Sequence, residues 1–176
     1  MGTKFTNIQI QETNLEIVKN ALIKYYTQRE KTRNEYYIGN LTENWVTVLH
    51  DYSWGEVRDE AIELSRYIPS PILAVHYFDD DLFELYLVEK GAILTCHISG
   101  FEDYMDSLPK MGNIKLLIEK LQLQISENEL SSVLSADDLE EKVSKLEDIF
   151  RAPLWIKYDW INEDEELQSR FLKLVL

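Results

Sequence analysis

The chain has 176 residues, a formal net charge of −14 at pH 7 and a hydrophobic content of 45%. That content excludes a disordered chain. The negative charge argues against nucleic acid and anionic lipid as partners, because both are bound mainly through Lys and Arg. The single cysteine, Cys96, cannot close an intramolecular disulfide and favours a reducing compartment. No apolar run approaches the roughly 20 residues of a membrane span, and no signal peptide is recognisable. We therefore expect a cytoplasmic protein with no nucleic-acid and no membrane partner.

Strand and helix signals alternate over the first 70 residues. Two capping boxes, Thr13 to Glu16 and Ser53 to Glu56, have the spacing that satisfies free N–H groups at a helix start. Pro69 ends the second helix, because proline cannot continue one. The expected elements are a strand at 5–11, a helix at 15–26, strands at 35–41 and 45–50, and a helix at 57–68.

The longest apolar stretch, residues 71–100, predicts three central strands. Residues 72–78 are apolar at nearly every position, which is typical of a strand that is covered on both faces. The three consecutive acids of 79–81 predict a solvated turn. A three-residue reversal is expected to end at Gly91, in the left-handed conformation that glycine tolerates. The expected strands are 72–78, 82–88 and 92–98.

Beyond residue 100 the pattern changes from strands to helices. Ser126 and Ser135 begin short polar runs that are typical of helix starts. Pro153 ends the last of these helices. The expected elements are helices at 114–121, 130–134 and 139–150, some strand character at 154–160, and a last short helix at 167–174.

The order of these elements predicts the fold class. The succession β-α-β-β-α-β-β-β starts as the ferredoxin-like arrangement does, in which two helices pack on one face of an antiparallel sheet. We predict an α+β fold with a mainly antiparallel sheet of five to six strands covered by helices. Residues 1–100 form the sheet core, and residues 101–176 form a mainly helical C-terminal appendage that packs on it in one compact domain.

The sequence contains no motif of a reaction centre. Cys96 lies inside a predicted strand and no serine stands in a Gly-x-Ser-x-Gly turn, so nucleophilic catalysis is not indicated. No glycine-rich loop precedes a helix, as phosphate binding would require. The acids of 79–81 lack the alternate spacing of a calcium loop. We therefore expect no catalytic residue, no cofactor and no metal site.

Negative charge is concentrated in the second half of the chain. Residues 1–70 carry 8 Lys or Arg and 10 Asp or Glu, a balance of −2, whereas residues 71–176 carry 10 and 22, a balance of −12. Such a field attracts a basic partner and speeds its encounter. We therefore favour a non-enzymatic acidic binding protein with a basic protein partner. The candidate partner-binding residues are the acidic turn and three tryptophans that are suited to anchoring an interface: Asp79, Asp80, Asp81, Trp54, Trp155 and Trp160.

Two alternatives are left open. The first is a small-molecule or metal-dependent enzyme or sensor that uses His76, His97 and the 79–81 turn. The second is a structural role in which the protein associates with itself as a homo-oligomer.

Three stretches of the sequence carry a resemblance. The motif NWVTV, a helix that ends in LS and the hairpin ILAVHYFDDDLFELYLVEKG resemble a group of bacterial α+β proteins of uncharacterised function, over residues 45–121. The resemblance implies a strand, an acidic turn and a second strand, followed by a Gly-ended hairpin and a helical tail. It brings no catalytic residue. Small acidic bacterial proteins of this kind are often immunity proteins, so the resemblance implies a protein that neutralises a basic toxin.

Overall fold

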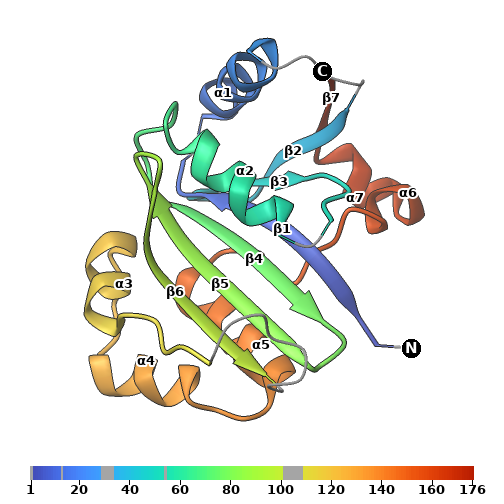
Figure 1. Ribbon diagram of the computed structural model, residues 1–176. Coiled ribbons are helices and arrows are strands. Elements are labelled where there is room, and N and C mark those ends of the chain that lie inside the picture. The colour runs from blue at the N-terminus through green and yellow to red at the C-terminus, as the bar shows by residue number, and fades with distance from the viewer. Residues whose placement is uncertain (1, 13, 29–33, 54, 101–108) are drawn as a thin grey trace.

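The described residues form one antiparallel sheet of seven strands, in the order β6-β5-β4-β1-β3-β2-β7 (Figure 1). The structure is a computed structural model, and it describes residues 2–12, 14–28, 34–53, 55–100 and 109–176. The strands are β1 (Lys4–Ile10), β2 (Glu35–Thr42), β3 (Trp45–Leu49), β4 (Ile72–Phe78), β5 (Leu82–Glu89), β6 (Ala92–Gly100) and β7 (Leu172–Val175). The helices are α1 (Leu15–Thr27), α2 (Glu56–Leu64), α3 (Ile114–Leu121), α4 (Glu127–Leu134), α5 (Leu139–Phe150), α6 (Trp160–Glu163) and α7 (Glu165–Ser169).

The first six elements have the predicted ferredoxin-like arrangement. Their strands lie in the order β4-β1-β3-β2, and every neighbouring pair is antiparallel. The strands β5 and β6 extend the sheet beyond β4, and β7 extends it beyond β2. The predicted fold class and the succession β-α-β-β-α-β-β-β are confirmed, whereas the predicted number of five to six strands is wrong by the addition of β7.

Helices cover both faces of the sheet, and alternate strand residues point to opposite faces. On one face, side chains such as Ala74 and Tyr86 pack with the apolar residues of α1 and α2. On the other face, side chains such as Val75 and Leu85 pack with α3, α4 and α5. Figure 1 shows α2 in front of the strands and α5 behind them. The burial of Ile72–Phe78 on both faces explains why β4 is apolar at nearly every position.

Buried polar side chains hold residues 153–156 against the sheet. The Asn7 amide donates to the carbonyl oxygens of Leu154 (2.8 Å) and Ile156 (2.9 Å), and the Gln9 amide donates to that of Pro153 (2.8 Å). Thr47 completes the group by donating its hydroxyl to Gln9 (2.8 Å). The carbonyl oxygens of 153, 154 and 156 are thus paired with side chains and not with the backbone of a neighbouring strand. For this reason the segment 154–160, where strand character was expected, does not form a strand.

The end of the chain differs from its prediction. A helix was expected at 167–174, but α7 ends at Ser169 and the chain then pairs with β2 as β7. The apolar residues that suggested one helix belong to two elements. Leu167 of α7 packs with a cluster that includes Ile161 of α6, whereas Leu174 of β7 is buried on the face covered by α1 and α2. Pairing with the open edge of β2 satisfies those backbone groups of β7 that face β2.

The predicted helix starts and the predicted turn after β5 agree only in part with the structure. Thr13 and Trp54 lie outside the described residues, and the α1 N-cap is Asn14. Ser53 donates its backbone N–H and its hydroxyl to Glu56, as the second capping box predicts, although the N-cap position of α2 is Gly55. The reversal after β5 has two residues, 90 and 91, instead of three, and both have positive φ as in a type I′ turn, whose twist matches the strands.

Candidate functional site

The predicted acidic turn joins β4 to β5 as a tight hairpin. Asp79 (φ 58°) and Asp80 (φ 62°) are in the left-handed conformation, which aspartate tolerates better than most residues do. The Asp81 N–H donates to the Phe78 carbonyl oxygen (2.9 Å) and closes the turn. Asp80 is exposed and accepts a hydrogen bond from the Tyr77 hydroxyl. The turn therefore has a structural role and still presents a carboxylate to solvent.

The two predicted tryptophans that the structure describes, Trp155 and Trp160, do not lie together, and Trp54 is outside the described residues. Trp155 is half-buried against Phe5 and Tyr77, with ring centroids 5.0 Å and 4.9 Å from its own. Because Tyr77 also donates to Asp80, this tyrosine links Trp155 to the acidic turn. Trp160 lies apart in α6, half-buried, with Lys157 Nζ 5.9 Å from its ring centroid.

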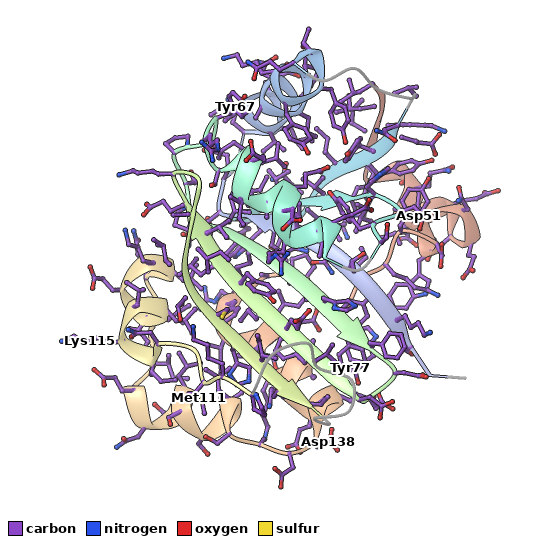
Figure 2. The ribbon with its side chains drawn as sticks, in the orientation of Figure 1. Asp51, Tyr67, Tyr77, Met111, Lys115 and Asp138 are labelled. Carbon is purple, nitrogen blue, oxygen red and sulfur yellow. The ribbon has the colours of Figure 1, made fainter. Side chains whose placement is uncertain are left out.

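The start of α5 brings more acids to the same end of the sheet. Asp137 and Asp80 line one cavity. The pKa of Tyr77 is raised, first by burial and then by the hydrogen bond and charge of Asp80. The charges of Glu140 and Asp138 raise it further. Figure 2 shows Tyr77 and Asp138 toward the same end of the molecule. We name this group the acidic end and define it by its members Asp79, Asp80, Asp81, Asp137, Asp138, Glu140 and Glu141.

Part of this charge has a local explanation. Asp138 is the α5 N-cap, and its carboxylate accepts the Glu141 N–H at 2.8 Å. Acids in a first helical turn also interact favourably with the helix dipole. The described residues supply one ion pair to the acidic end, between Glu141 and Lys145. Asp137 and Glu140 are exposed, and the described residues give their carboxylates no hydrogen bond or ion pair.

A second acidic group lies on the short C-terminal helices. We name it the C-terminal patch, and its members are Glu163, Asp164, Glu165 and Glu166, all exposed. Asp164 caps α7 by accepting the Leu167 N–H at 2.9 Å. Lys173 of β7 pairs with Glu35 of β2.

A cavity of about 490 Å³ lies beside the acidic end, between β6 and the turn that joins α4 to α5. Lys142 of α5 lines it, and its side chain is almost fully buried, with an exposure of 1%. Its Nζ donates to Ser99 Oγ at 2.8 Å. His97 is 3% exposed, and its Nε2 lies 3.2 Å from the same Oγ. Two basic side chains, Lys142 from α5 and His97 from β6, therefore converge on the hydroxyl oxygen of Ser99, and we call this group the cavity floor.

Burial shifts the pKa of both bases at this floor. It lowers the pKa of Lys142 from 10.5 to about 8, against an opposing contribution from the charge of Asp137. Burial, with the charge of Lys142 as the smaller cause, lowers the pKa of His97 from 6.5 to about 4. Both shifts follow from the cost of placing a charge in a poorly hydrated site. His97 is therefore neutral at pH 7.

The two histidines of the enzyme alternative do not come together. His76 lies on the α2 face, where its Nδ1 is 2.9 Å from Glu84, and it lines a separate cavity of about 260 Å³ with His50. His97 points to the opposite face. The residue of β6 in register with His76 and Glu84 is Ile98, and His97 is its neighbour in the strand. Among the described residues, no group of three or more His, Cys, Asp or Glu side chains is placed to hold a metal ion.

Sequence reasoning missed Ser99 and Lys142. Ser99 stands in no nucleophile motif, and 43 residues separate it from Lys142. One signal was present: Lys142 falls in the apolar stripe of α5, between Leu139 and Leu146 and beside Val143. A lysine at a core position of an amphipathic helix indicates a buried amine, which requires a partner.

Comparisons with protein-family models, with curated proteins and with solved structures found no match. No helix formed by the described residues has both the length and the apolar character of a membrane span.

Proposed function

We propose that this protein binds a basic protein partner through the acidic end. The observation that carries the proposal is the convergence of the β4–β5 turn with the start of α5, which places Asp80 and Asp137 on the wall of one cavity. These two segments are distant in the sequence, and the described residues pair one carboxylate of the group with a cation. A surface whose negative charge is not neutralised within the chain attracts a positively charged partner.

The cations near this surface do not cancel its charge. Lys142 is buried and donates to Ser99. Lys145 is committed to Glu141, and Lys110 is the exposed cation on the wall of the cavity. Lys4 also lies close to the turn, with its Nζ 4.1 Å from the ring centroid of Phe78. The seven acids of the acidic end still outnumber these four lysines, and the chain as a whole has a net charge of −14.

An aromatic side chain lies next to these acids. Trp155 is half-buried and packs against Tyr77 with the two rings tilted at 58°, and Tyr77 donates to Asp80. Interfaces concentrate their binding energy in a few aromatic residues surrounded by polar ones. Among the described tryptophans, Trp155 is thus the one best placed to contact a partner that docks at the acidic end.

The class of partner follows from the charge. A protein that binds nucleic acid does so through clustered Lys and Arg side chains, and such a surface is complementary to a cluster of carboxylates. The resemblance to a group of bacterial α+β proteins, of a kind that often serves as immunity proteins, agrees with a partner of this class, a nuclease-type toxin. On this proposal the acidic end occupies the phosphate-binding surface of the toxin.

Capture of a partner from native lysate, followed by measured binding of the purified partner, tests this proposal. The test variant carries Asp137→Asn, Glu140→Gln and Glu141→Gln, which remove three charges and leave the Asp138 cap intact. The matched control carries Glu163→Gln, Glu165→Gln and Glu166→Gln, which remove three charges from the C-terminal patch and leave the Asp164 cap intact.

We expect a basic partner whose association rate falls steeply as salt rises, because charge steering is screened. The test variant should associate on the order of tenfold more slowly than wild type, and the control should change much less. Salt-independent capture, or an equal loss in both variants, would contradict binding through the acidic end.

A further inference from the structure

The hydrogen-bond geometry at the cavity floor fixes where the His97 proton lies. The Gly112 backbone N–H donates to His97 Nδ1 at 3.4 Å, so this nitrogen is an acceptor. The neutral ring therefore carries its proton on Nε2. That N–H points to Ser99 Oγ at 3.2 Å and donates to it. His97 thus occupies one lone pair of the serine oxygen and fixes its position.

Lys142 occupies the remaining side of the same oxygen. Its Nζ is 2.8 Å from Ser99 Oγ, which is within reach for proton transfer. Among the described residues Ser99 is the one hydrogen-bond partner of this ammonium group, although an ammonium has three donors. An amine held in this way is readily deprotonated. When Lys142 is neutral, the Ser99 hydroxyl can donate its hydrogen to the Nζ lone pair.

We propose that Ser99 is a nucleophile and Lys142 its general base, in a site that hydrolyses esters with a short apolar acyl group. A serine activated by a neighbouring lysine is a known form of nucleophilic catalysis. His97 is a positioning residue, since it acts through Ser99. This activity goes beyond the proposed binding function and does not depend on it.

The surroundings of Ser99 select this class of substrate. Ser99 is half-buried and lines the cavity of about 490 Å³, so an acyl group can approach it from that side. Leu134 and Leu139 contribute apolar surface to the wall, which suits a short hydrocarbon chain. The wall carries two carboxylates, Asp80 and Asp137, and two amines, Lys110 and Lys142, so it has no excess charge that would favour an ionic substrate over an uncharged ester.

The reaction proceeds in two balanced steps. Ser99 Oγ forms a bond to the ester carbonyl carbon as its proton passes to Lys142 Nζ. The tetrahedral adduct then expels the alcohol oxygen, which takes the proton from the Lys142 ammonium, and Ser99 is left acylated. Water next attacks the acyl carbon and gives a proton to Lys142. Collapse of this second adduct releases the carboxylic acid and returns the proton to Ser99.

A fluorophosphonate probe that reacts with activated serines tests this proposal on the full-length protein. Peptide mass spectrometry should locate the label on Ser99. The labelling rate should rise with pH to a midpoint near the Lys142 pKa of about 8. The other groups that line this cavity and carry charge are Asp80, Asp137 and Lys110.

Three test variants and one control variant separate a catalytic from a structural role. Ser99→Ala should abolish labelling, and Lys142→Met should slow it on the order of 100-fold or more, the usual contribution of a general base. Ser144→Ala, on the exposed side of α5, is the control and should react as wild type does. His97→Gln should slow labelling and leave the pH midpoint unchanged, because the base is Lys142.

Hydrolysis of p-nitrophenyl acetate gives a second readout with the same variants. Circular dichroism verifies that each variant is folded. Labelling of Ser99 no faster than that of surface serines would overturn the proposal. An unchanged labelling rate in folded Lys142→Met would overturn it equally, since the lysine would then have only a structural role.

Discussion

Replacement of Lys142 by methionine is expected to stabilise the folded protein. Lys142 is 1% exposed, and its burial lowers its pKa from 10.5 to about 8. One pKa unit corresponds to about 1.4 kcal/mol, so keeping this ammonium buried costs about 3 kcal/mol at pH 7. The substitution also removes the hydrogen bond to Ser99, which contributes about 1 kcal/mol. Lys142→Met should therefore raise the free energy of unfolding by about 2 kcal/mol at pH 7.

The pH dependence identifies the cause of this gain. The pKa of Lys142 is lower in the folded state than in the unfolded state, so the unfolded chain binds more protons between pH 8 and 10.5. The stability of the wild type therefore rises with pH across this window. The methionine variant lacks this contribution. Its advantage should shrink by about 2 kcal/mol between pH 7 and pH 9.5.

Urea unfolding of both proteins at pH 7 and pH 9.5 measures the effect. Lys145→Met is the matched control, because Lys145 lies on the exposed face of α5 in a pair with Glu141. Its stability should stay within about 0.5 kcal/mol of wild type at both pH values. A destabilised Lys142→Met, or a gain that is the same at both pH values, would refute the reasoning.

Three other perturbations have defined outcomes. Asn7→Leu should lower the free energy of unfolding by about 2–4 kcal/mol, because it leaves two carbonyl oxygens of 154–156 unpaired; a loss below about 1 kcal/mol in urea unfolding would contradict this. His97 has a folded pKa of about 4, below its unfolded value of 6.5, so stability should fall as pH drops from 6.5 to 4. Over this pH range the free energy of unfolding of His97→Gln should fall by up to about 3 kcal/mol less than that of wild type. An equal fall in both proteins would count against a buried neutral ring. Gly39→Ala would place a Cβ 2.5 Å from the Arg170 carbonyl oxygen. Amide hydrogen exchange in β7 should accelerate, and unchanged protection would show that the clash is relieved elsewhere.

The central strands could be predicted because local pattern and burial agree there. Residues 72–78 are apolar because helices cover both faces of β4, and the acidic run after them marks the turn into β5. The two helices that follow β1 and β3 carry apolar stripes with recognisable starts and ends. Local signals of this kind were sufficient to give the ferredoxin-like order.

The last strand and the cavity floor could not be predicted in this way. The strand β7 forms because the edge of β2 is open to it, which is a property of the assembled sheet. The contact of Ser99 with Lys142 depends on the packing of α5 against β6, and no motif spacing encodes it. Trp155 similarly gains its position from Phe5 and Tyr77, which are distant in the sequence.

The most direct test of the acidic end is a nuclear magnetic resonance titration of the protein with poly-L-lysine at low salt. Binding there predicts the largest amide shifts at residues 79–81 and 137–141, and these shifts should disappear as salt is added. The C-terminal patch at 163–166 serves as the internal comparison. Shifts concentrated at 163–166, or spread evenly over the acids of both halves of the chain, would contradict the assignment of the binding surface to the acidic end.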